Sequence, residues 1–174
     1  MAISLYDVSV RSFLQTLGAV AHFLEKGRVH CEANGISLAT LVETRVHEDM
    51  LPFRFQVVSV CHHTAGALAG VKAGEFHPPG AMEPLDYAGL QALVADAKAA
   101  LEALTPVEVN AYEGKDVVFK LGERAMPFTA EGFLQSFSTP NLHFHASMTY
   151  AILRATGVPL GKRDYMGALR MKMA

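Results

Sequence analysis

Two pairs of histidines are the residues of this chain best suited to chemistry. His62 with His63, and His143 with His145, lie in segments that are otherwise largely apolar. A neutral imidazole is both a common metal ligand and a hydrogen-bonding group that can work inside a protein. Positions two apart on a helix are rotated by about 200°, so His143 and His145 cannot point at one atom. Only one of them can share a site with the first pair.

The helical faces select His145 as the inward residue of its pair. His143 shares its face with polar residues, whereas His145 shares its face mainly with apolar ones, namely Leu142, Met148, Thr149 and Ile152. An apolar stripe on a helix faces the core. We therefore predict that His145 and His63 are largely buried and close together, with His143 more exposed.

Two interpretations of His63 and His145 are open. They could form half of a metal site in a helical core, which usually takes ligands from several facing helices. Such a site would bind zinc, nickel or manganese and activate a bound water. The third ligand is not evident: Glu48 and Asp49 are candidates, but both stand where a helix begins and capping accounts for them.

The alternative interpretation is a polar layer in the core without a metal. The two histidines would then hydrogen-bond each other or nearby polar side chains, namely Gln56, Ser59 and Asn141. Three further histidines, His22, His30 and His77, are interpreted as surface or hydrogen-bonded residues. The sequence has no HExxH, P-loop, GxGxxG or GxSxG motif.

Composition narrows the class of protein. The 174 residues, 51% of them hydrophobic, predict one domain spanning residues 1–174 with a substantial core. A formal net charge of −2 gives no general attraction for nucleic acid. No apolar stretch reaches the ~20 residues of a membrane span, and the start lacks a secretion signal. With Cys31 and Cys61 forming no disulfide framework, we expect a cytoplasmic protein with neither nucleic acid nor membrane as a partner.

Apolar periodicity predicts a mainly helical protein. A capping box at Ser4 and Asp7 starts a helix that ends near Gly27, and Ser37 caps a short helical run. Asp49 is predicted to cap a buried helix over 53–71, and Asp86 a helix that ends before Pro106. Residues 116–121 and 124–128 predict a β-hairpin with a two-residue turn. Thr129 caps a short helix, Pro140 interrupts it, and the last helix spans 141–156.

The C-terminal segment is locally basic. Five cations stand against the single acid Asp164: Arg154, Lys162, Arg163, Arg170 and Lys172. This pattern fits either a solvated basic tail or an anion site. Apolar residues after Gly157 predict that the segment folds back over the helices along an extended path, with Arg154 paired to Asp164.

Particular motifs resemble one known family. Residues 140–145, 150–154 and 157–164, together with 49–53, Gln56 and His63, resemble the uncharacterised bacterial domain-of-unknown-function family nineteen ninety-three. That family is related to the DinB/YfiT-like metalloenzyme superfamily. The resemblance covers nearly the whole chain, and the Gly-Lys-Arg-Asp segment at 161–164 is its most specific part.

The resemblance implies a DinB-like four-helix bundle of up-down-down-up type, with the small β-hairpin before the last helix, forming a homodimer. Active relatives bind a divalent metal through three histidines and act on thiol-linked substrates. They take two ligands from an HxxxH on the last helix, but here Asn141 and Thr149 stand four residues either side of His145. His63 and His145 thus match metal positions and nothing certain matches the third.

The function expected from this pattern is a non-catalytic or small-ligand-binding homodimer with a buried histidine network. The alternative is a divalent-metal-dependent enzyme that uses His63 and His145 on a small, thiol-linked substrate. Five further residues are predicted ligand contacts: Gln56, Asn141, Thr149, Arg154 and Lys162.

Overall fold

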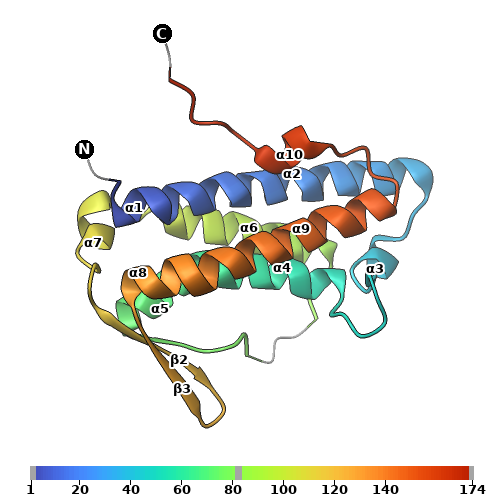
Figure 1. Cartoon of the computed structure of the whole chain (residues 1–174). Helices are drawn as coiled ribbons and strands as arrows, with labels where there is room; N and C mark the ends of the chain where they lie inside the picture. The colour runs from blue at the N-terminus through green and yellow to red at the C-terminus, as the bar shows by residue number, and fades with distance from the viewer. Residues whose placement is uncertain (1–2, 81–83, 173–174) are drawn as a thin grey trace.

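Long helices that lie side by side form most of the molecule, as the computed structural model shows (Figure 1). The structure describes residues 3–80 and 84–172. The long helical segments are α2 (Val10–Asn34), α4 (Phe53–Cys61) continued by α5 (Ala67–Ala73), α6 (Tyr87–Glu102) and α9 (Thr139–Ala155). Helices α2 and α4 each pack against both α6 and α9, so their apolar faces meet in one core.

Short elements connect and close the long helices. They are α1 (Leu5–Val8), α3 (Leu38–Leu41), α7 (Pro106–Asn110), α8 (Ala130–Phe133) and α10 (Lys162–Met166). Two π-helical turns, η1 (His62–Gly66) and η2 (Leu134–Ser138), join α4 to α5 and α8 to α9. Each pair therefore forms one continuous helical segment with a wider turn inside it.

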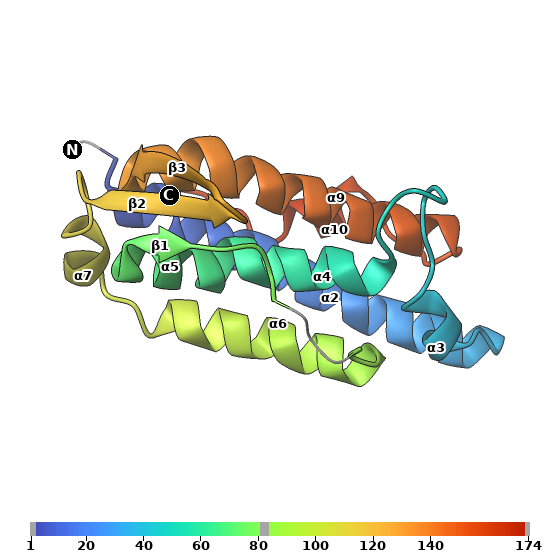
Figure 2. The same cartoon turned by 90° about the horizontal axis from the view of Figure 1, so that it is seen from below.

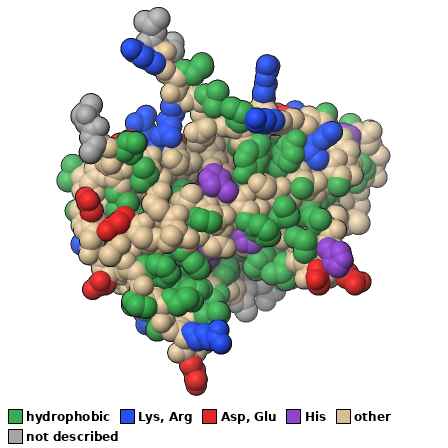
Figure 3. All heavy atoms as spheres, viewed as in Figure 1, with side chains coloured by type: hydrophobic (Ala, Val, Ile, Leu, Met, Phe, Trp, Pro, Cys, Tyr) green, Lys and Arg blue, Asp and Glu red, His purple; other side chains and the backbone are tan. Residues whose placement is uncertain are grey.

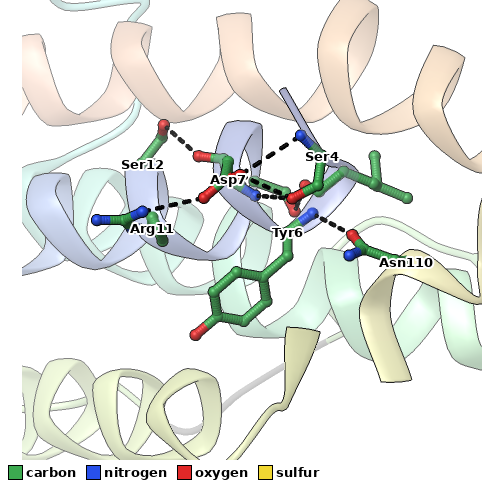
Figure 4. A network of polar contacts seen from close by, with 8 residues as sticks. Ser4, Tyr6, Asp7, Arg11, Ser12 and Asn110 are labelled. Carbon is green, nitrogen blue, oxygen red and sulfur yellow. Dashed lines mark hydrogen bonds and ion pairs between the residues drawn. The ribbon is translucent and has the colours of Figure 1, made fainter. Parts of the chain in front are cut away.

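Most helix starts follow the predicted caps. The side chain of Asp86 accepts a hydrogen bond from the Gly89 amide at 2.7 Å, and Ser37 and Thr129 cap α3 and α8 in the same way. Ser4 and Asp7 form the expected capping box, although the helix breaks at Ser9 before α2 begins. Figure 4 shows this network, in which Asp7 also binds Arg11.

Three predicted helix boundaries were wrong. The first long helix ends at Asn34, not near Gly27, because Gly35 takes the left-handed conformation (φ 65°) that terminates a helix. Asp49 does not cap α4; its carboxylate lies 2.6 Å from Nδ1 of His47, and Pro52 occupies the cap position. Pro140 does not interrupt the last helix, because it falls in the first turn of α9 directly after the wider π-turn η2, which runs into α9.

The predicted hairpin is present and gains a third strand. Strands β2 (Asp116–Leu121) and β3 (Arg124–Thr129) pair antiparallel in the predicted register, with Leu121 opposite Arg124. The sequence did not predict β1 (Glu75–Phe76), which pairs parallel to β2. Figure 2 shows this sheet near one end of the helices, beside α5. Phe76 is thereby carried into the interior.

The segment after Gly157 folds back over α2, as predicted, but through a short helix rather than an extended path. Val158 and Leu160 are buried, and the ring of Tyr165 in α10 stacks on Phe23 of α2. Beyond α10 the chain is exposed, with Leu169 half exposed. The ordered contact therefore covers the segment as far as α10.

The predicted pair between Arg154 and Asp164 was wrong. Arg154 donates to the Val158 carbonyl at 3.0 Å, just beyond the end of its own helix. Asp164 instead accepts from the Gly161 amide at 2.6 Å and lies 2.9 Å from His22 Nε2 and 3.2 Å from Lys26 Nζ. These contacts lower the pKa of Asp164 to about 2, the Gly161 amide contributing most. Nothing in the sequence favours His22 and Lys26 over Arg154 as the partners of Asp164.

The contacts of the Asp164 carboxylate with Gly161, His22 and Lys26 form a clasp between α10 and α2. We expect Asp164→Asn to lower the free energy of unfolding by about 1–2 kcal/mol, because the clasp loses the negative charge that strengthens these contacts. Urea denaturation followed by circular dichroism measures this change. Asp96→Asn, at an exposed position of α6, is the matched control and should change stability by less than about 0.5 kcal/mol. Equal losses of stability in the two variants would show that the Asp164 contacts do not stabilise the protein.

Candidate functional site

The two histidines predicted to meet lie together between α4 and α9. His63, in η1, is only 8% exposed, and its ring stacks on that of His145 with 6.0 Å between centroids and 10° between planes. His145 is partly buried and His143 is exposed. Leu142, Thr149 and Ile152 are buried beside His145, as the helical-face argument predicts.

Gln56 fixes the orientation of His145. The side-chain NH2 of Gln56 donates to the Leu51 carbonyl at 2.8 Å, which leaves its carbonyl oxygen facing Nδ1 of His145, also at 2.8 Å. An amide carbonyl only accepts, so Nδ1 of His145 must carry the proton and donate it. The lone pair of His145 is therefore on Nε2.

Burial keeps both histidines neutral. It lowers the pKa of His145 to about 4. It lowers the pKa of His63 to about 3, and the neighbouring His62 and His145 lower it further. At neutral pH both rings are uncharged. Each then offers one N–H donor and one lone pair.

His63 has an unsatisfied ring nitrogen. Its Nδ1 is buried and has no hydrogen-bond partner in the part of the chain that the structure describes. Leaving a buried polar atom unpaired costs about 1–3 kcal/mol, and such atoms in native proteins commonly mark a water, an ion or a ligand. The site thus has an open hydrogen-bonding position beside the ordered His145–Gln56 pair.

A π-helical turn carries His63 into this position. Inserting η1 into the helix widens the turn, and the Thr64 hydroxyl donates to the Val60 and Cys61 carbonyls at 2.8 and 3.0 Å. π-Turns inside α-helices are often found at functional sites. Periodicity alone could not reveal this turn, because the sequence around it reads as a regular apolar helix.

Aromatic rings form the walls of the site. Phe76 and Phe137 each lie 5.7 Å, ring centroid to centroid, from His63, while Phe55 lies 5.9 Å from His145. His62 stacks on Phe76 at 4.3 Å and its Nε2 lies 2.8 Å from the His77 carbonyl oxygen. Sequence reasoning missed these rings, since Phe76 stands in what reads as a loop.

Of the other predicted ligand contacts, two lie near the pair and two do not. Thr149 donates to the His145 carbonyl at 2.9 Å, and Asn141 donates to the Phe137 carbonyl at 2.8 Å. Arg154 is exposed at the far end of α9 and Lys162 is exposed on α10. The structure therefore assembles Gln56, His63 and His145, with Thr149 and Asn141 supporting the α9 side.

These residues do not fit the three-histidine metal site that the resemblance implies. In residues 3–80 and 84–172, no group of three or more His, Cys, Asp or Glu side chains is placed to hold one metal ion. Neither candidate third ligand joins such a group: Asp49 is engaged with His47, and Glu48 is exposed in the same loop. The donor set stops at two imidazoles, fewer than the three protein ligands of a catalytic zinc site.

The arrangement of the long helices and the small sheet is that of a known fold. A solved structure, that of a DinB family member protein from Shewanella denitrificans, matches with a TM-score of 0.80 and 24% sequence identity, over 98% of this chain and 96% of the other. At that identity the likeness shows the fold. No curated protein matches the sequence.

The family model for the domain of unknown function DUF1993 matches residues 5–166, and the chain belongs to that family. Within the described residues, no helix is long and apolar enough to cross a membrane.

Proposed function

We propose that the protein is a non-catalytic, small-ligand-binding member of its family, in which Gln56, His63 and His145 form a neutral polar binding position. Two features of neighbouring residues support this proposal. Gln56 holds His145 in one tautomer, while Nδ1 of His63 is buried without a hydrogen bond to any described residue. Aromatic walls around uncharged donors favour a small, uncharged ligand with one donor and one acceptor.

Assembly and location are part of the same proposal. The ring of contacts among α2, α6, α4 and α9 supports the up-down-down-up bundle and a single domain over residues 1–174. We propose a homodimer, because half-exposed apolar side chains such as Phe144 and Leu51 remain on the surface. Two buried, unpaired cysteines support a cytoplasmic location. Arg154 and Lys162 lie away from Gln56, His63 and His145, so they would contact only a ligand bound elsewhere on the protein.

A second candidate is a divalent-metal-dependent enzyme acting on a small, thiol-linked substrate. One observation favours it: the bond from His145 Nδ1 to the Gln56 carbonyl is the type of second contact that orients metal-binding histidines and leaves Nε2 available. The incomplete ligand set argues against it.

Metal uptake and histidine NMR separate the two functions. After dialysis against zinc or nickel and then against buffer, we expect less than one metal per chain by elemental analysis. Nitrogen NMR should show both rings neutral at pH 7, with the proton of His145 on Nδ1. Acetamide and phenol, used as uncharged probes, should shift the ring signals of His63 and those of its stacked neighbour His145, and the His145 signals are followed in the variants.

The matched control is His143→Gln, on the exposed face of α9, which should leave the probe shifts unchanged, whereas His63→Leu should abolish them. Retention of one metal per chain that is lost in His145→Gln would overturn the proposal in favour of the enzyme. Probe shifts that persist in His63→Leu would also overturn it.

A further inference from the structure

The start of α2, the η2–α9 segment and the chain after α10 surround a groove of about 700 Å³. Its polar lining comes from Asp7, Arg11, Ser12, Gln135, Thr139, His143 and Arg170. Figure 3 shows several Lys and Arg side chains along the upper part of the face on which the C-terminal segment lies. We propose that this groove binds a small phosphorylated molecule.

The donors that remain available in the groove are cationic or imidazole groups. Thr139, Ser12 and Gln135 already donate to the Leu134, Asp7 and Val8 carbonyls, at 2.8, 3.4 and 3.4 Å. The Arg170 guanidinium and the His143 ring make no hydrogen bond or ion pair with any residue in 3–80 or 84–172. These two groups can therefore bind a ligand without breaking a contact.

The charge of the groove favours an anion. Arg11 and Arg170 supply two positive charges against the single carboxylate of Asp7. That carboxylate is already engaged: it binds Arg11 Nη1 at 3.1 Å and accepts from Ser4 Oγ at 2.8 Å, as Figure 4 shows. The bond to Asp7 holds Arg11 in place and uses only one of its five N–H donors.

Phosphate fits this arrangement better than carboxylate. The free donors reach the groove from three separate segments: Arg11 from α2, His143 from α9 and Arg170 from the C-terminal chain. A planar carboxylate is matched by one two-pronged arginine, whereas a tetrahedral phosphate has oxygens for donors on several sides. The groove also exceeds one ion in size and has Ile3 and Val8 on its wall, so the phosphate should carry an organic group.

The Gly-Lys-Arg-Asp segment at 161–164 has a role in this proposal, because it positions the chain that carries Arg170. Asp164 clasps α10 to His22 and Lys26 of α2, and Gln15 donates to the Met166 carbonyl at 2.8 Å. Gly167 then turns the chain with φ 62°, and an added Cβ there would lie 3.0 Å from the Gln15 carbonyl oxygen. From this turn the chain brings Arg170 to the groove.

Calorimetric titration tests the site with inorganic phosphate, phenyl phosphate and succinate as probes. We expect saturable binding of both phosphates, tighter for phenyl phosphate, with succinate at least about tenfold weaker than inorganic phosphate. Arg170→Gln should weaken phosphate binding about tenfold, the contribution of one charge-assisted hydrogen bond. The matched control is Arg124→Gln, which removes an exposed arginine from the hairpin and should leave binding unchanged.

Arg170 lies in an exposed segment, so its variant should fold normally, and circular dichroism checks this. Equal binding by the native protein and Arg170→Gln would overturn the proposal. So would equal weakening by Arg124→Gln, or succinate binding as tight as phosphate. Absence of saturable binding at millimolar phosphate would overturn it as well.

A double-mutant cycle tests the positioning role of Asp164. If the clasp acts by aiming Arg170, Asp164→Asn weakens phosphate binding in the native background and has no further effect in Arg170→Gln. A merely structural effect would weaken binding by the same factor in both backgrounds. That result would overturn the link between the motif and the groove.

Discussion

Replacing Phe76 with alanine is expected to lower the free energy of unfolding by about 3–5 kcal/mol. Phe76 is 4% exposed, and its ring contacts Phe133 at 5.0 Å and His62 at 4.3 Å, measured between centroids. The residue belongs to the two-residue strand β1, so little backbone pairing remains to hold the segment when the ring is gone. The loss combines buried apolar area with the cavity left in a close-packed cluster.

Urea denaturation followed by circular dichroism measures this loss, with Phe144→Ala as the matched control. Phe144 carries the same side chain on α9 but is 52% exposed, so its removal should cost less than about 1 kcal/mol. The Phe76 variant should also raise the pKa of His63 toward its ordinary value, because water reaches the ring. A loss below about 1 kcal/mol in Phe76→Ala would show that β1 is not packed as described.

Local signals in the sequence predicted much of the helical framework. Capping residues such as Asp86 and Ser37 act within one turn, so neighbouring residues determine their role. The hairpin was predictable for the same reason, since Gly122 can adopt the φ of 58° that its two-residue turn requires. Where a partner lies far away in the chain, the prediction failed: Asp164 binds residues 138 and 142 positions earlier, not Arg154.

The candidate site was predictable where it depends on helical phase. His145 and Gln56 each lie on the inward face of one helix, and the structure joins them. Features that depend on tertiary packing were not predictable. Phe76 enters the site through a parallel strand pair, and η1 changes the turn at His63 without any change in composition. Both features lack a short-range sequence signal.

The histidine pair should make the protein unstable in mild acid. In the unfolded chain both histidines have a pKa near 6.5, whereas in the folded protein burial lowers the values to about 3 for His63 and about 4 for His145. Between these values the unfolded chain binds more protons than the folded one. Stability is therefore fully present above about pH 6.5 and is lost as the pH falls toward 4, by up to about 1.4 kcal/mol per pH unit for each histidine.

Urea denaturation at a series of pH values from 7 to about 4.5 measures this dependence. His145→Gln and His63→Leu should each remove somewhat less than half of the slope, because each takes away one buried group that resists protonation. His62 lies beside His63 and burial lowers its pKa too, so a smaller slope should persist when both are replaced. Asp164 acts in a separate window, because its depressed pKa costs stability only as the pH falls below its ordinary value of 3.8.

The matched control is His143→Gln, which removes a histidine two residues from His145 but on the exposed face of α9. Its slope should equal that of the native protein, since this variant leaves both buried rings in place. A slope reduced as much by this variant as by His145→Gln would mean that burial is not the cause. A native protein whose stability is constant from pH 7 to 5 would mean that His63 and His145 take up protons while folded, and the site would then hold charged rather than neutral rings.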